Sequence, residues 1–346
     1  MAMSDKMRTA PGARFQNRAP GPTFRPMFTG EAVAVYDWHC PGCDAPGHGE
    51  EYNDSYEVVV VRRGAFVREV NESPAFISAG TLMFASAGEV HRISHPVPGG
   101  DACSVFRGSL PTLREIMDLL EPGAWDRQEP RFPLRQAAIG GREYLLHRLA
   151  MRAAAAGTDA VEQEESALWF LHAALAFAWG RRHGGTAPAP GLGRAARRRA
   201  LEYAAGAEDV VRRGYAARLT LVEIGRAVGC SPFHLSRMVR AVTGLSIHRI
   251  LLRYRLRHAL ELILDSRAGL SAVAFATGFS SHAHLTDAFR REFGCSPDRV
   301  RRRSPAQIRA LLHATREVHE EGRHAGAHHP HSDARGEGRR QGSALL

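Results

Sequence analysis

The side chains with the most distinctive chemistry lie within ten residues of one another: His39, Cys40, Cys43 and His48. Thiolate and imidazole groups are preferred zinc ligands, and a Cys-x-x-Cys pair has the spacing of such ligands. The same pair could instead form a disulfide under oxidant and act as a redox switch. No second Cys-x-x-Cys occurs, so we predict reduced thiols in a loop, without metal or other cofactor. The candidate ligands, should a metal bind, are Cys40, Cys43, His48 and His91.

Arginine is concentrated in residues 194–303, where 21 arginines stand against 9 acidic residues, a net charge of +12. The whole chain of 346 residues carries +10, so the remainder is slightly acidic. Lys6 is the only lysine, which suggests a genome that favours arginine, but such a bias would have spread the arginines evenly. Their concentration therefore predicts a polyanionic partner, with double-stranded DNA the first choice.

The same arginine-rich segment contains an internal repeat. Apolar residues and a glycine at 221–229 recur 49 positions later, at 270–278, and a serine, two apolar residues and a glycine at 231–244 recur 50 positions later, at 281–294. In each copy the spacing predicts a short helix ended by glycine, followed by a second helix that a serine caps. Two helices joined by a short glycine-containing turn form a helix-turn-helix, whose second helix reads the major groove.

Residues 246–265 lie between the two copies and contain no helix breaker. Apolar residues at helical spacing predict one continuous helix, ~30 Å long at 1.5 Å per residue. A rigid helix of that length could hold two reading helices about one turn of B-DNA apart, ~34 Å. The spacing therefore predicts that both helices contact the same face of the duplex.

Short apolar or β-branched runs separated by turn signals fill residues 31–107 and predict an all-β barrel or sandwich. The expected strands cover 32–38, 56–62, 65–70, 81–85 and 103–106. Helical periodicity begins at Leu110, and two longer helices are expected at about 139–156 and 160–182. These two helices are more apolar than a solvent-facing pair, which indicates either a homodimer interface or packing on the barrel.

Composition gives the expected organisation along the chain. We predict a disordered tail at 1–30, a barrel with helices at 31–183, a linker at 184–198, a DNA-binding domain at 199–305, and a helix remnant with a disordered tail at 306–346. No stretch approaches 18 uncharged apolar residues, and the first 28 residues lack the apolar core of a signal peptide. We therefore expect no membrane partner and a cytoplasmic location.

Several segments resemble the AraC/XylS family of bacterial transcription regulators over roughly residues 200–305. They are Gly229–Leu235 with Arg237, the run RYRLRHALELIL at 253–264, and residues 278–302. Residues 57–66 and 84–97 resemble the cupin-like sensor domains that often precede this DNA-binding domain. The resemblance implies an α+β multidomain protein: an N-terminal cupin-like β-barrel with flanking helices, then an all-α domain of two helix-turn-helix units joined by a long helix.

The function that the resemblance implies is transcription regulation under the control of a ligand or signal at the barrel, not catalysis. RNA polymerase and an unidentified small-molecule effector are further expected partners. The resemblance places base contacts at the exposed start of each reading helix and phosphate contacts later on. The predicted base-reading residues are Phe233, His234, Ser236 and Arg237 in the first helix, and His282, His284, Thr286 and Asp287 in the second. The predicted phosphate contacts are Arg240, Arg290 and Arg291. Asp287 departs from the family, which often has arginine there, so the second half-site is expected to be read weakly.

Three other functions are considered: a metal-dependent cupin oxidoreductase with a basic tail, an architectural DNA-binding protein, and a regulator that senses metal or thiol oxidation through Cys40 and Cys43. A cupin enzyme holds its metal with histidines and a glutamate. Of the first cupin motif only Glu57 and Gly64 keep their spacing, and the paired histidines before Glu57 are absent. In the second motif, His91 is present, but His95 replaces the asparagine. An architectural protein would not need the barrel, so regulation is favoured.

Overall fold

A computed structural model describes residues 22–42, 49–126, 128–157, 159–181 and 194–312. The chain divides into two compact units, Met1–Arg302 and Arg303–Leu346. In the second unit, residues 305–312 are helical. None of the helices in the described ranges combines the length and the hydropathy that crossing a membrane requires.

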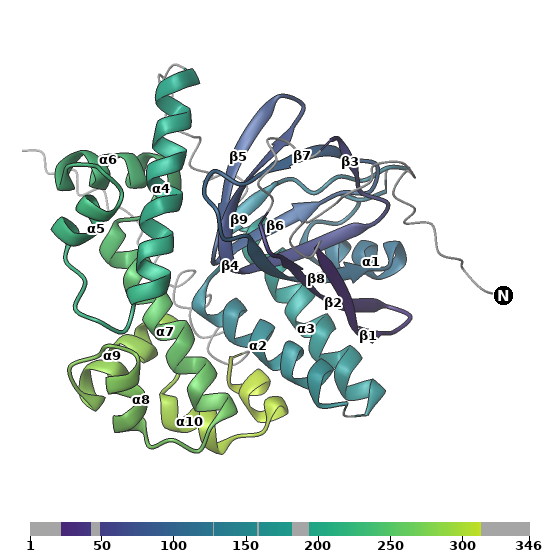
Figure 1. Cartoon of the computed structure of the whole chain (residues 1–346). Coiled ribbons are helices and arrows are strands. Elements are labelled where there is room, and N and C mark those ends of the chain that lie inside the picture. Colours follow the sequence, from purple (N-terminus) through teal and green to yellow (C-terminus); the bar gives the residue numbers. More distant parts are fainter. Residues whose placement is uncertain (1–21, 43–48, 127, 158, 182–193, 313–346) are drawn as a thin grey trace, which may run out of the picture. The chain divides into compact units, whose positions relative to one another are not determined.

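The N-terminal region of the first unit is an antiparallel sheet (Figure 1). Its described strands are β1 (Thr23–Thr29), β2 (Val33–Cys40), β3 (Glu51–Tyr52), β4 (Tyr56–Val70), β5 (Ser73–Ser78), β6 (Thr81–Ala85), β7 (Val90–Ser94), β8 (Asp101–Gly108) and β9 (Gln136–Ala138). The main path runs β1-β2-β8-β4-β6-β9, while β5 and β7 pair with β4 and β3 pairs with β7.

Strand β4 joins the two parts of the sheet. Its first half, a buried run of valines, lies between β8 and β6. The register with β8 shifts between Val61 and Arg63, and a bulge of this kind bends a strand. The second half then pairs with β5 and β7. The bend curves the sheet around one apolar face, where Val59, Val61, Phe66, Ile77, Cys103 and Val105 pack together.

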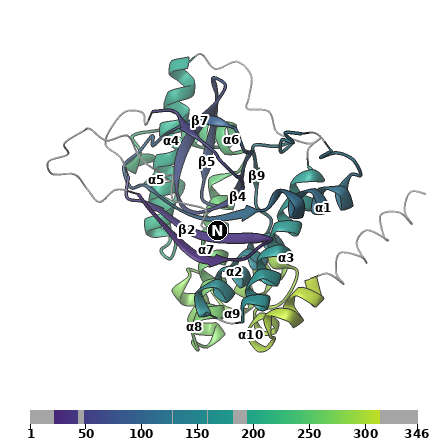
Figure 2. The same ribbon diagram turned by 90° about the vertical axis from the view of Figure 1, so that its right-hand side faces the viewer.

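The other face of the sheet is covered by helices. Helix α1 (Leu110–Leu120) is followed by α2 (Gly141–Ala156) and α3 (Ala160–Trp179), and α2 and α3 run side by side against the sheet (Figures 1 and 2). The rings of Phe106 on β8 and Phe170 on α3 lie 4.4 Å apart, and both are fully buried. Leu145, Leu149, Leu171 and Leu175 are also buried within the chain. Packing on the sheet, one of the two alternatives for these helices, therefore accounts for their apolar residues.

The C-terminal region of the first unit is helical. Its helices are α4 (Arg194–Gly214), α5 (Leu221–Ala227), α6 (Pro232–Thr243), α7 (Ile247–Asp265), α8 (Leu270–Ala276), α9 (His282–Phe293) and α10 (Pro297–Arg302). The pairs α5–α6 and α8–α9 have matching lengths, 7 and 12 residues. Gly229 and Gly278 follow the first helix of each pair with positive φ, 68° and 80°. The repeat in the sequence thus folds into two equivalent helix pairs, with α7 between them.

The structure corrects several sequence-based boundaries. Residues 23–29, within the predicted disordered tail 1–30, form β1, and residues 194–198, within the predicted linker 184–198, begin α4. The strands expected at 56–62 and 65–70 are one strand, because a bulge replaces the predicted turn. Strands β3, β5, β7 and β9 were not predicted. The expected linker at 184–193 and the terminal residues 313–346 lie outside the described residues.

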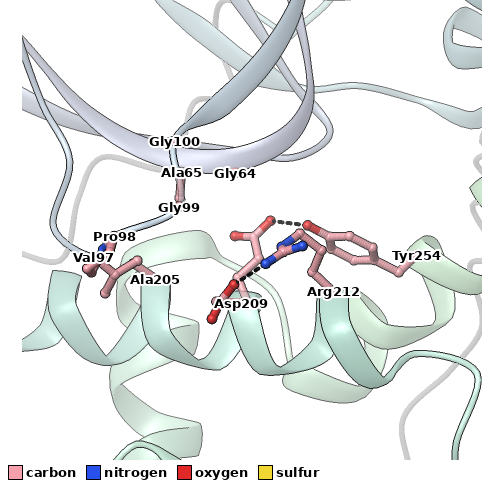
Figure 3. A pocket seen from close by; sticks show the side chains of 11 residues that line it. Gly64, Ala65, Val97, Pro98, Gly99, Gly100, Ala205, Asp209, Arg212 and Tyr254 are labelled. Atoms are coloured by element: carbon pink, nitrogen blue, oxygen red, sulfur yellow. Dashed lines mark hydrogen bonds and ion pairs between the residues drawn. The ribbon is translucent and has the colours of Figure 1, made fainter. Parts of the chain in front are cut away.

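One apolar cluster connects the sheet to the helical region. Ala65 and Phe76 of the sheet belong to the same buried cluster as Ala204 and Val211 of α4, Leu235 and Val239 of α6, and Leu251 and Tyr254 of α7. At its edge lies a pocket of about 320 Å³, including space open to solvent, between residues 97–100 and helix α4 (Figure 3). The two regions are therefore packed together rather than tethered.

Glu208 of α4 lies at this contact with only 4% of its surface exposed. The hydroxyl of Tyr254 donates a hydrogen bond to its carboxylate over 3.2 Å. Burial raises the pKa of Glu208 to about 7, although hydrogen bonds from Ser78, Tyr254 and the backbone of Ala79 act in the opposite direction. The contact thus contains a carboxyl group that titrates near neutral pH.

This titration predicts a pH dependence of stability. The ordinary pKa of 4.5 applies to the unfolded chain, so the folded chain binds the Glu208 proton more tightly. The resulting stabilisation is complete below pH 4.5 and is lost as the pH rises to about 7, by up to about 1.4 kcal/mol per pH unit. In Glu208→Gln we expect the free energy of unfolding to fall less over that window, as measured by urea denaturation. The control is Glu202→Gln on the same helix, and equal pH slopes for wild type and Glu208→Gln would contradict the prediction.

Candidate nucleic-acid interface

Helices α6 and α9 begin in the same way. Ser231 Oγ accepts a hydrogen bond from the backbone N–H of His234, and Ser281 Oγ accepts one from that of His284. Such caps fix where a helix starts, and therefore which residues lie on its outer face. Leu235 on α6 and its counterpart Leu285 on α9 are fully buried, so the opposite face of each helix is presented to solvent.

The predicted contact residues of α6 lie on that outer face. Phe233 is 75% exposed, unusual for a large apolar side chain. His234, Arg237 and Arg240 are exposed, and Ser236 is half-buried. The ring of His234 meets Tyr203 of α4 edge-on, with centroids 5.9 Å apart. The start of α6 therefore offers an apolar ring, an imidazole and a guanidinium to a partner.

The predicted contact residues of α9 lie on its outer face too. His282, His284, Asp287, Arg290 and Arg291 are exposed, and Thr286 is half-buried. Ser280 Oγ lies 3.0 Å from His284 Nδ1, and the His284 ring packs edge-on against Phe279. Asp287 occupies the position that Arg237 has in α6, 50 residues earlier. The second helix thus presents an acceptor where the first presents a donor.

The arginines of α6 and α9 differ from nearby arginines in whether a carboxylate of the chain neutralises them. Arg198, Arg213 and Arg249 each pair with a carboxylate of the chain, Glu202, Asp209 and Glu292 respectively. Among the residues that the structure describes, Arg237, Arg240 and Arg290 have no such carboxylate partner. Unpaired guanidinium groups on one side of a helix are suited to binding phosphate or a base edge.

Glu292, which is not among the residues predicted from the sequence, fixes the position of α9. Its carboxylate lies 2.7 Å from Arg249 and 3.7 Å from Arg253, both on α7. Burial lowers the pKa of Arg253 to about 10, so the side chain remains charged at neutral pH. The sequence does contain a feature that could have indicated this role of Glu292, namely the i, i+4 spacing of Arg249 and Arg253 on α7.

Helix α9 also contacts the N-terminal region through α2. A Cβ atom on Gly141, at the start of α2, would lie 1.9 Å from the backbone oxygen of Glu292. Tyr144 Oη, one turn along α2, donates to Glu261 of α7 over 3.5 Å, and Arg148 pairs with Asp265 over 3.0 Å. Two helices of the C-terminal region are therefore held by one helix of the N-terminal region.

Two of the four candidate ligands predicted from the sequence, Cys40 and His91, lie in the described residues. Cys40 is buried at the end of β2, whereas Cys43 and His48 lie outside the described residues. His91 on β7 lies 3.3 Å from the Glu51 carboxylate. Glu57, the glutamate of the incomplete cupin motif, accepts a hydrogen bond from Arg107 over 2.8 Å. The grouping of Cys40 with His91 stays a prediction.

Comparisons with known proteins agree with this geometry. A family model described as a helix-turn-helix domain matches residues 224–303. The HTH-type transcriptional regulator GlxA of Rhizobium meliloti (strain 1021) is 32% identical over 231 residues, which are 66% of this chain and 64% of that protein. The HTH-type transcriptional activator RhaS of Shigella sonnei (strain Ss046) is 25% identical over 299 residues, covering 79% of this chain and 93% of that protein. This chain thus spans just under two thirds of the length of GlxA.

A solved structure, the C-terminal domain of AraT, a response regulator from Geobacillus stearothermophilus, is similar over 29% of this chain and 84% of that one, with 27% identity and a TM-score of 0.28. The helical region is a DNA-binding domain of the helix-turn-helix class. Residues 224–303 thus match a helix-turn-helix family, and the chain is similar to proteins named as HTH-type transcription regulators.

Substitution of Arg237 on α6 and of Arg290 on α9 is expected to change DNA binding in different ways. Arg237→Ala should relax base preference at one position, by about 1–3 kcal/mol of discrimination. Arg290→Ala should weaken binding to all sequences alike and reduce the salt slope by about one. Arg25→Ala, which removes an exposed arginine of β1 paired with Asp37, is the matched control. Affinities for a panel of single-base operator variants at several salt concentrations provide the measurement, and identical profiles for Arg237→Ala and Arg290→Ala would rule out direct readout by Arg237.

Proposed function

We propose that this protein is a sequence-specific transcription regulator in which two helix-turn-helix units read double-stranded DNA and an N-terminal cupin-like barrel receives a signal. The observation that carries the proposal is the matched outer faces of α6 and α9, with exposed arginines that have no carboxylate partner among the described residues. Relatives named as a transcriptional regulator and a transcriptional activator support it. Because the partner would be chromosomal DNA, the protein would act in the cytoplasm.

Helix α7 sets the spacing of the two units. Its 19 residues span ~28 Å at 1.5 Å per residue, somewhat less than one turn of B-DNA, ~34 Å. With α6 and α9 in successive major grooves, a site of two half-sites about 10 base pairs apart would be bound on one face. This arrangement needs only one chain per site.

The exposed side chains suggest how each half-site is read. Arg237 would bind guanine O6 and N7 through its forked guanidinium, and Phe233 would contact a thymine methyl group. Asp287 would accept from cytosine N4, or else oppose the phosphates, so the α9 half-site is the weaker one. Arg240, Arg290 and Arg291 lie later on their helices and would bind phosphates.

The signal would reach the DNA through the contacts of the N-terminal region with α4, α7 and α9. A ligand that binds the barrel changes DNA affinity only if the two states of these contacts bind it differently. The shared apolar cluster and the α2–α9 contact are the parts of the structure that would differ between the two states. RNA polymerase is a further expected partner, and a homodimer through residues 139–182 is not required to bury their apolar side chains.

Substitution at the α2–α9 contact tests this coupling. In Gly141→Ala the new methyl group would clash with the backbone of Glu292, which would free α9 to adjust to DNA. We expect operator affinity to rise about fivefold or more, within the usual range of allosteric coupling. Operators come from genome-wide mapping of sites bound by the full chain, and affinities from titration of those fragments. Gly49→Ala, where an added methyl group meets nothing, is the control; unchanged affinity in Gly141→Ala would refute the coupling.

A further inference from the structure

Strand pairing brings Cys40, Asp101 and Cys103 to one end of the sheet. Cys40, the last residue of β2, lies directly opposite Asp101, the first residue of β8. Cys103 is two residues further along β8, so it points to the same face as Asp101. That face is the concave one, because Cys103 belongs to the apolar cluster with Val61 and Phe66.

His95 reaches the same place from the segment that precedes β8. Its Nε2 atom lies 2.8 Å from Asp101 Oδ2, and Cys103 Sγ donates to Asp101 Oδ1 over 3.3 Å. One ligand atom each from Cys40, His95 and Asp101 falls within 4.8 Å of the other two. The side chains of Cys40, His95 and Asp101 therefore converge on one point, and Cys103 is joined to it through its hydrogen bond to Asp101.

This cluster is buried to an extent that is costly for polar groups. Cys40, Asp101 and Cys103 are 4%, 3% and 3% exposed, and the side chain of His95 is 5% exposed. Placing a carboxylate and an imidazole beside two thiols in an apolar interior is destabilising unless their charges are compensated.

We propose that Cys40, His95 and Asp101 bind a divalent transition-metal ion, and that this ion is zinc. One sulfur atom, one imidazole nitrogen and one carboxylate oxygen form a three-ligand set of the kind that zinc takes, with the fourth tetrahedral position left for water or another ligand. Thiolate ligands disfavour magnesium and calcium, which prefer oxygen. The ligands differ from those of the cupin motifs, which centre on His91 and Glu57, and they do not include Cys43.

The position of the site suggests a regulatory use. His95 and Asp101 bracket residues 96–100, and residues 97–100 line the pocket against Glu208 and Arg212 of α4 (Figure 3). A Cβ atom on Gly100 would lie 1.9 Å from the backbone oxygen of Cys40, so this segment packs tightly on a ligand residue. Metal binding would fix both ends of the segment that contacts the DNA-binding region. This second step rests on the proposed function, whereas the metal site does not.

The test uses the full chain, purified under reducing conditions, loaded with Zn²⁺ and then freed of excess metal. We expect one equivalent of zinc by elemental analysis. With Co²⁺ instead, we expect the near-ultraviolet sulfur-to-cobalt charge-transfer band that thiolate ligation produces. Cys40→Ser and His95→Ala should each weaken Zn²⁺ affinity at least ~100-fold, the upper range seen for changes next to a ligand. Cys43→Ser is the matched control and should retain full affinity.

Each result decides the assignment. Substoichiometric zinc, or a Co²⁺ spectrum without the charge-transfer band, would overturn the site for the wild-type chain, whatever the variants do. Loss of zinc in both Cys40→Ser and Cys43→Ser, with retention in His95→Ala, would assign the metal to the Cys-x-x-Cys pair instead. Operator affinity with and without Zn²⁺ tests the second step: bound zinc with unchanged operator affinity would confirm the site and overturn its regulatory use. A chain that binds zinc but no DNA sequence would leave the site standing while the proposed function fails.

Discussion

The buried contact between the sheet and helices α4, α6 and α7 is the constraint on which the rest of this structure depends. Ala65 and Phe76 share one apolar cluster with helix residues that also support the first reading helix, Leu235 and Val239. Separating the regions would expose this apolar surface to water, which is unfavourable in proportion to its area. Helix α6 therefore shares one apolar core with the sheet.

This apolar contact also contains polar groups whose charge can change with conditions. Glu208, buried against Tyr254, exchanges a proton near neutral pH. Residues 97–100 line the same pocket as Glu208, and Asp101 directly follows them in the chain. A buried polar group can adopt few other arrangements, because leaving its charge unsatisfied or uncompensated costs several kcal/mol. A change in the protonation of Glu208, or binding of metal at the proposed site, would therefore change the packing of α4.

The reading helices could be predicted from sequence because their determinants are local. The caps Ser231 and Ser281, the glycines after the first helix of each pair, and the 49- and 50-residue offsets are all visible in one sequence. Strand β1 could not be predicted, since Pro26 interrupts its register with β2 and proline is typical of edge strands and bulges. The cluster of Cys40 with His95 and Asp101 was missed because β2–β8 pairing joins residues about sixty positions apart. Sequence proximity pointed instead to Cys43 and His48.

The central claim is that α6 and α9 each read a half-site and that α7 fixes their separation. In vitro selection of random duplex DNA by the full chain tests it most directly, since the operator emerges from the selection itself. We predict a recovered motif with two half-sites about 10 base pairs apart, of which one is strongly conserved among the selected sequences and the other, opposite Asp287, weakly. Recovery of a single half-site, two half-sites at variable spacing, or no enriched sequence would contradict it.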